Sequence, residues 1–216
     1  MLPEGVALDI ITLGVSQLRT EDAEKVFPKY LPAAQHLEKQ ECDVIIAAGS
    51  IVFTLLGWDR SIEALQKIQD SVKVPVINNL QTHFDALDVF SAKKVALVTP
   101  YEDARNQERK KLLERFGYQV VSMKGLGLRR RIDIEKAPYY ATYQLSKQAV
   151  AEAPDAEAIY ISCPEWATIR NIEKIEKDTG IPVVAPVPSL IWAALKTMNI
   201  KASITGYGKL LELCER

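Results

Sequence analysis

The sequence predicts an α/β fold of two pseudo-symmetric lobes, each a mainly parallel sheet flanked by helices. Three observations predict it. Short apolar runs without charges alternate with amphipathic helical patterns, the runs have the composition of strands buried on both faces, and the order of elements occurs twice along the chain. The chain of 216 residues is long enough for one large or two small cores.

The first half begins with an apolar, β-branched run at residues 6–13, which predicts a strand. Thr20 then provides a helix cap, with acidic residues in the first turn, and the helix is expected to continue to about residue 41. Further strands are expected at 43–48, 74–77 and 94–99, and further helices at 61–71, 80–90 and 100–116.

The second half repeats this alternation around a less regular stretch at residues 124–138. Strands are expected at 118–123, 158–162 and 181–184, and helices at 139–153, 167–178 and 189–198. We expect an N-terminal lobe at 1–100, with the C-terminal helix packing back on it, and a C-terminal lobe at 101–216 that contains Cys163. The basic run at 129–131 is expected to be a solvated connection between the lobes, with an anion-attracting rim as the alternative.

An internal repeat relates the two halves. Residues 42–101 and 157–208 share the order strand, turn, helix, Pro-Val strand, helix and small-residue strand. The turns after corresponding strands should then face one cleft. In this alignment Gly49 takes the place of Cys163, so we expect a thiol on one wall of the cleft and none at the matching position of the other.

Cys163 follows a buried strand, where open α/β sheets place their ligands. The N–H groups of the helix expected after it would favour a thiolate or a bound carboxylate. A small buried hydrophobe is the alternative, because free cysteine is among the most buried residue types. His83 lacks a ligand-spaced partner, so we expect it to serve packing rather than catalysis.

Charge and cysteine content argue against several classes of function. Lys+Arg 27 against Asp+Glu 28 gives a formal net charge of -1, so we expect neither nucleic acid nor a membrane surface as a partner. Three cysteines without CxxC spacing argue against a disulfide framework or a zinc site and favour a reducing compartment. Charges interrupt every apolar run before the ~18 residues of a membrane span, and no leader opens the chain, so we expect a cytoplasmic protein.

Four segments together carry a resemblance that covers nearly the whole chain. DVIIAAGS, LVTPYEDARN, ISCPEWATIRNIEKIEKDTGIPVV and TGYGKLL occur in this order. This order resembles the aspartate/glutamate racemase superfamily, in the branch that contains maleate cis-trans isomerase and arylmalonate decarboxylase. The resemblance implies an enzyme without cofactor or metal that stabilises a carbanion or enediolate next to the carboxylate of a small (di)carboxylic acid. It also implies that the first strand of the N-terminal lobe is missing here.

The resemblance implies a set of site residues. Cys163 would be the catalytic residue, as proton donor or nucleophile. The other residues expected to bind substrate or line the cleft are Gly49, Ser50, Tyr101, Pro164, Glu165 and Ser189. Ser50 and Tyr101 would hold the carboxylate through their hydroxyl groups. Pro164 has no N–H to offer an oxyanion, and Glu165 adds negative charge beside the thiol, so both depart from the decarboxylase pattern.

The single thiol favours an arylmalonate-decarboxylase-like reaction, in which Cys163 protonates the enediolate left after CO₂ departs. Racemisation is disfavoured, because a two-base mechanism needs a proton acceptor on each face and Gly49 has none. A maleate-type isomerase, with Cys163 adding to the double bond, is one alternative. A non-catalytic ligand-binding relative is the other, which Pro164, Glu165 and the missing strand favour. A homodimer is left open.

Overall fold

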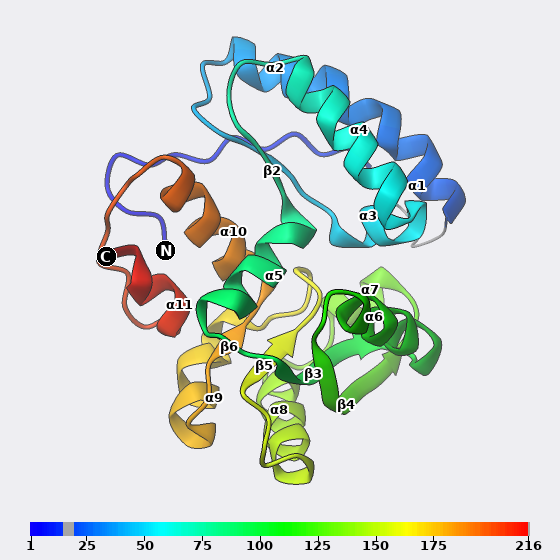
Figure 1. Ribbon diagram of the computed structural model, residues 1–216, viewed down its shortest axis with the longest axis vertical. Coiled ribbons are helices and arrows are strands. Elements are labelled where there is room, and N and C mark those ends of the chain that lie inside the picture. Colours follow the sequence, from blue (N-terminus) through cyan, green and yellow to red (C-terminus); the bar gives the residue numbers. More distant parts are fainter. Residues whose placement is uncertain (15–19, 216) are drawn as a thin grey trace.

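The computed structural model describes residues 1–14 and 20–215, which form two parallel sheets flanked by helices (Figure 1). The larger sheet has the strand order β4-β3-β5-β6, and the smaller one pairs β1 with β2. All pairs in both sheets are parallel. The predicted fold class is therefore confirmed.

The smaller sheet and its helices come from the first 78 residues. Its strands pair in the register Ile45 with Val76 and Ala47 with Asn78. The elements are α1 (Thr20–Val26), a 3-10 turn (Phe27–Lys29), α2 (Tyr30–Lys39), β1 (Ile45–Ala47), α3 (Ser50–Leu56), α4 (Trp58–Asp70) and β2 (Val76–Asn78).

The larger sheet is built from the rest of the chain. Its elements are α5 (Asn79–Val89), β3 (Lys94–Tyr101), α6 (Asp103–Arg115), β4 (Gln119–Leu128), α7 (Arg131–Glu135), α8 (Ala141–Glu152), β5 (Ala158–Ile161), a 3-10 turn (Ile169–Asn171), α9 (Ile172–Thr179), β6 (Val183–Val184), α10 (Pro186–Thr197), α11 (Lys209–Glu212) and a final 3-10 turn (Leu213–Glu215). The chain passes from β3 to β4 on one side and returns to β5 on the other, so the carboxyl ends of β3 and β5 form a topological switch point.

The two faces of the larger sheet belong to different hydrophobic clusters, because side chains alternate along a strand. On β3, Val95 and Leu97 face a cluster that also contains Phe53 and Ile45 from the region of the smaller sheet. The other face, with Val98, belongs to a cluster that includes Cys163. One continuous core therefore joins the smaller sheet to one face of the larger sheet.

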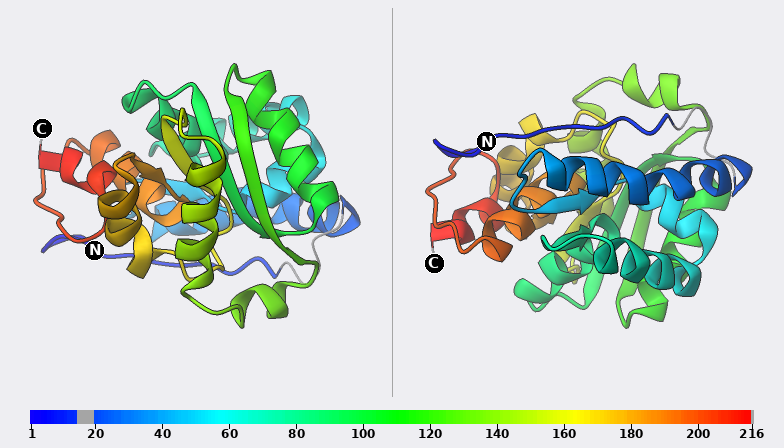
Figure 2. Two further views of the ribbon diagram at one scale, coloured as in Figure 1. Left: turned by 90° about the horizontal axis from the view of Figure 1, so that it is seen from below. Right: turned by 90° about the horizontal axis from the view of Figure 1, so that it is seen from above.

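Three sequence expectations were wrong in detail. Residues 6–13 form no strand; they run as extended chain along one side of the molecule, with Leu8 64% and Ile10 70% exposed (Figure 2). A β-branched composition does not supply a pairing partner, and this segment pairs with none of the described strands. Residues 201–208 likewise form no strand. The stretch at 124–138 is more regular than expected, because β4 continues to Leu128 and α7 follows.

The expected lobe boundary between residues 100 and 101 falls inside β3, which pairs with β4 and β5. Helix α10 packs against α5, so the C-terminal helices do contact an element of residues 1–100 (Figure 1). The division into lobes at 1–100 and 101–216 stays a prediction. In the part of the chain that the structure describes, no helix combines the length and apolar character needed to cross a bilayer.

Candidate active site

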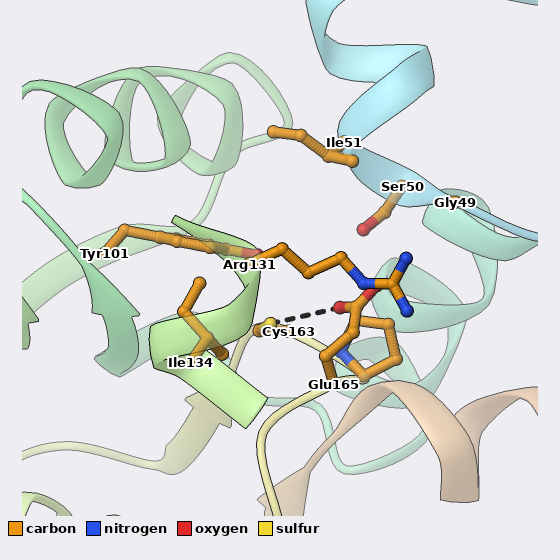
Figure 3. A pocket seen from close by; sticks show the side chains of 9 residues that line it. Gly49, Ser50, Ile51, Tyr101, Arg131, Ile134, Cys163 and Glu165 are labelled. Carbon is orange, nitrogen blue, oxygen red and sulfur yellow. Dashed lines mark hydrogen bonds between the residues drawn. The ribbon is translucent and has the colours of Figure 1, made fainter. Parts of the chain in front are cut away.

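A small pocket lies at the switch point, where the turns after three strands meet α7 (Figure 3). It is lined by Gly49, Ser50, Ile51, Tyr101, Arg131, Ile134, Cys163, Pro164 and Glu165. Its cavity of about 20 Å³ has room for about one water molecule. Six of the seven expected site residues line this pocket, and their roles stay predictions. The seventh, Ser189, is buried in α10 and donates a hydrogen bond to the Ala185 carbonyl at 2.9 Å, so it does not line the pocket.

Gly49 and Cys163 lie on opposite walls of the pocket, and both have a positive φ, of 104° and 106°. Glycine adopts positive φ freely, whereas a cysteine does so at a cost, and such outliers concentrate at functional sites. A Cβ atom at Gly49 would lie 3.0 Å from the Tyr30 hydroxyl. The two positions that correspond in the sequence repeat therefore also share a positive φ.

Cys163 does not lie at a helix N-terminus. The first turn after it spans Pro164 and Glu165, and helix α9 begins at Ile172. A helix dipole acts within about the first turn of the helix, so it cannot favour a thiolate nine residues earlier. The expectation that helix N–H groups stabilise the thiolate was wrong, because the helix begins later than its apolar pattern suggested.

The Cys163 thiol is held in its protonated form. Its side chain is buried, with 2% of the residue exposed, and it donates a hydrogen bond to Glu165 Oε2 at 3.2 Å (Figure 3). Burial, and then the charge of Glu165, raise the pKa of Cys163 to about 12, although a hydrogen bond with Tyr101 lowers it. At neutral pH this thiol can donate a proton, but it is a weak nucleophile.

Tyr101 presents a neutral hydroxyl to the same space. Burial is the main reason why the pKa of Tyr101 lies well above its usual range, and the neighbouring Cys163 adds to the shift. The Thr99 hydroxyl accepts a hydrogen bond from the Tyr101 N–H at 3.0 Å, and Asn106 Nδ2 donates one to the Tyr101 carbonyl at 3.0 Å. Thr99 also donates to Asn106 Oδ1. Hydrogen bonds of Thr99 and Asn106, both in the LVTPYEDARN segment, thus fix the end of β3 that carries Tyr101.

Ser50, at the start of α3, is fixed from behind by a buried hydrogen-bond chain. Its N–H donates to Asn79 Oδ1 at 2.9 Å, Asn79 Nδ2 lies 3.4 Å from His83 Nε2, and His83 Nδ1 lies 2.8 Å from the Tyr160 hydroxyl. Because Asn79 Oδ1 accepts from Ser50, its Nδ2 must donate to His83 Nε2. His83 therefore carries its proton on Nδ1 and donates it to Tyr160. This series of hydrogen bonds connects Ser50 to Tyr160 of β5, the strand that precedes Cys163.

His83 is neutral and lies outside the pocket lining. It is fully buried, and burial together with the positive charge of Arg109 lowers the pKa of His83 to about 3. Its ring contacts Tyr160 at 5.5 Å between centroids. The geometry thus gives His83 a place in a buried network that supports Ser50.

Sequence reasoning did not name Ile51 and Ile134 as site residues, and it considered Arg131 only as part of the basic run at 129–131, with an anion-attracting rim as the alternative. Arg131 begins α7, pairs with Glu135 at 2.8 Å, and extends into the space between Ser50 and Glu165 (Figure 3). The spacing of Arg131 and Ile134 on one helical face was the available signal. Nothing in the local sequence showed that this face would meet the turn of Cys163.

The polar side chains that line the pocket are those of Ser50, Tyr101, Arg131, Cys163 and Glu165. Within residues 1–14 and 20–215, no group of His, Cys, Asp and Glu side chains is arranged to hold a metal ion. All three cysteines are free.

Comparison with known proteins identifies the family. The family model described as arylmalonate decarboxylase matches residues 1–211, which is nearly the whole chain. The chain belongs to the arylmalonate decarboxylase family. This result also confirms the superfamily branch that the four sequence segments indicated.

Members of the arylmalonate decarboxylase family and its neighbours are similar to this chain along most of their length. Arylmalonate decarboxylase of Bordetella bronchiseptica is 23% identical over 201 residues, covering 93% of this chain and 84% of the relative. A maleate isomerase of Geobacillus stearothermophilus is 22% identical, covering 88% of this chain and 78% of the relative. A crystal structure of a liganded arylmalonate decarboxylase double mutant has a TM-score of 0.85 at 22% identity, covering 92% and 85% of the two chains.

These relatives are enzymes, and this member of the arylmalonate decarboxylase family is an enzyme as well. None of the relatives named above supports the alternative of a non-catalytic binding protein. The similar structure agrees with the fold found here, in which parallel strands deliver the pocket residues at their carboxyl ends.

Proposed function

We propose that this enzyme decarboxylates a small α-substituted malonate without a cofactor, and that Cys163 protonates the resulting enediolate. The observation that carries the proposal is the buried, protonated thiol of Cys163 opposite Gly49. A decarboxylase needs one proton donor on one face of the carbon, which is what these two positions provide.

The reaction balances with the groups in the pocket. The bond between the α-carbon and one carboxylate breaks, CO₂ leaves, and the electron pair passes into the remaining carboxylate as an enediolate. The Cys163 S–H proton then goes to the α-carbon. In this proposal the hydroxyls of Ser50 and Tyr101, which line the pocket, donate hydrogen bonds to the enediolate oxygens, and each such donor is worth about 3 kcal/mol of barrier by analogy with oxyanion holes.

Charge in the pocket fits a dicarboxylate once Glu165 moves aside. Arg131 supplies a positive charge among the nine lining residues, and Glu165 supplies a negative one. The cavity of about 20 Å³ cannot hold a malonate together with the Glu165 carboxylate in its present place. Glu165 is two residues from Cys163 in an exposed turn, so substrate binding displaces it toward solvent.

The second candidate is a maleate-type isomerase, which the similarity to maleate isomerase favours. This reaction requires the Cys163 sulfur to add to a carbon–carbon double bond. Addition needs a thiolate, and the raised pKa of Cys163 opposes its formation. The decarboxylase is therefore the preferred function.

The two reactions are separated by incubating the enzyme with phenylmalonate or with maleate in deuterated water and following products by NMR. We expect CO₂ release from phenylmalonate and one deuterium at the α-carbon of phenylacetate. The Cys163→Ala variant should lose this activity, whereas Cys42→Ala, a change at a thiol outside the pocket, should retain it. Conversion of maleate to fumarate with no CO₂ from malonates would overturn the proposal.

A further inference from the structure

A decarboxylase with one proton-donating thiol must regain that proton in every turnover. Protonation of the α-carbon leaves Cys163 as a thiolate, while 2% of the residue is exposed to solvent. Buried Tyr101, Ile134 and Trp166 belong to the same hydrophobic cluster, so solvent has little direct access to the sulfur. A group that reaches both the sulfur and the solvent is therefore needed.

Glu165 meets both conditions. It is an exposed residue in the turn after β5, and its carboxylate folds back so that Oε2 lies 3.2 Å from Cys163 Sγ (Figure 3). Pro164 stands between the two residues, and its ring fixes φ of the turn near −65°. Cys163 itself has the positive φ of 106° that turns the chain here. The turn thus places a carboxylate that can exchange protons with solvent beside the buried sulfur.

We propose that Glu165 is a catalytic proton relay, which takes a proton from solvent and passes it to the Cys163 thiolate after each turnover. The inference rests on the proposed decarboxylation. The Glu165 carboxylate first takes a proton from hydronium or water of the bulk solvent, which leaves water or hydroxide. The new Glu165 O–H bond then breaks as the Cys163 S–H bond forms, which returns Glu165 to the carboxylate that accepts the thiol hydrogen bond. No oxidant or other co-reactant is involved.

The direction of transfer follows from the two acids. Burial raises the pKa of the Cys163 thiol to about 12, so its thiolate is a far stronger base than a carboxylate and takes the proton from it. Substrate and the Glu165 carboxylate compete for the same space beside Sγ, because the cavity holds about 20 Å³. The relay therefore acts between turnovers, when product has left and Glu165 returns to the sulfur.

The test compares the first turnover with later ones in Glu165→Gln. The amide keeps the size of the side chain but cannot deliver an acidic proton. In rapid mixing with excess phenylmalonate, we expect a burst of about one product per active site, followed by a steady-state rate at least tenfold below that of the wild type. Acetate buffer near pH 5 should restore part of that rate in Glu165→Ala, because acetic acid can replace the missing carboxyl group.

The controls separate this relay from the proposed function. Glu173→Gln, an exposed change on α9 outside the pocket, should behave as the wild type. An unchanged steady-state rate in Glu165→Gln, or an equal loss of burst and steady-state rates with an unchanged melting temperature, would overturn the relay. Failure of the decarboxylation itself would appear differently, as a wild-type enzyme that releases no CO₂.

Discussion

Gly49 and Cys163 face each other across the pocket with backbone φ values that differ by 2°. The two positions therefore share a positive φ but differ in chemistry, because only Cys163 carries a thiol. The only side-chain atoms that distinguish them are the Cβ and sulfur of Cys163. A proton reaches a planar enediolate from the Cys163 face, so the proposed reaction yields a product of one configuration from a prochiral malonate.

The variant Gly49→Cys should lose this selectivity. A second thiol would place a proton donor and acceptor on the opposite face, and product would racemise. Chiral chromatography of the product from a prochiral malonate, such as 2-methyl-2-phenylmalonate, measures this directly. We expect a stability loss of about 1–3 kcal/mol from a side chain at positive φ near the Tyr30 hydroxyl. Gly49→Ala is the matched control: it has the same strain, and its product should keep one configuration.

Alkylation of Cys163 should be slow at ordinary pH. With a pKa of about 12, roughly one thiol in ten thousand is ionised at pH 8. Iodoacetamide labelling of a Cys42→Ala, Cys214→Ala enzyme should therefore accelerate about tenfold per pH unit up to pH 10. Glu165→Gln should label faster at every pH, because the neighbouring negative charge is gone. Labelling at the rate of a free cysteine peptide at pH 8 would contradict the protonated thiol.

Arg131→Leu should weaken substrate binding more than it slows chemistry. The guanidinium of Arg131 lines the pocket, and its charge attracts a dicarboxylate before bond breaking begins. We expect KM to rise at least tenfold, with a smaller change in kcat and a weaker dependence on ionic strength. Arg129→Leu removes an equal charge that is 78% exposed and pairs with Glu102, and it serves as the control. Equal effects of both variants would remove the specific role of Arg131.

His83 should make the fold sensitive to moderate acid. Its pKa is about 3 in the folded chain and about 6.5 when unfolded, so the unfolded state binds a proton first as pH falls. The stability due to neutral His83 is complete above pH 6.5 and is lost progressively toward pH 3, by roughly 5 kcal/mol. Urea unfolding at several pH values should show this slope. His83→Gln should be less stable at pH 7 and should show a shallower slope between pH 6.5 and 4.

The sequence was sufficient for the features that depend on local pattern. β3 and β5 were predictable because they are uninterrupted apolar runs, and the structure buries them on both faces. The segment at residues 6–13 is also mostly apolar and β-branched, apart from Asp9, but pairing depends on a neighbour that local sequence does not reveal. Composition therefore predicts which segments can form a strand, but it does not predict whether a segment finds a strand to pair with.

The site residues at the ends of strands could be predicted from the sequence. The residues that reach the pocket from other segments could not. The repeat and the strand ends predicted that Gly49 and Cys163 face one cleft, and the family resemblance added Ser50 and Tyr101; all four residues line one pocket in the structure. Arg131 enters from α7, a helix in a stretch that seemed irregular. The orientation of Glu165 depends on the positive φ of Cys163, which no residue pattern indicates for a cysteine.

The core that joins the smaller sheet to one face of the larger sheet makes the two parts of the chain depend on each other for folding. Val95 and Leu97 of β3 lie fully buried in the same cluster as Phe53 and Tyr160. A chain ending at residue 100 would leave β3 without its neighbours β4 and β5, and a chain beginning at 101 would lack the strand that lies between β4 and β5. Each part of the chain therefore completes the core and sheet of the other, and we expect neither part to fold when it is expressed alone.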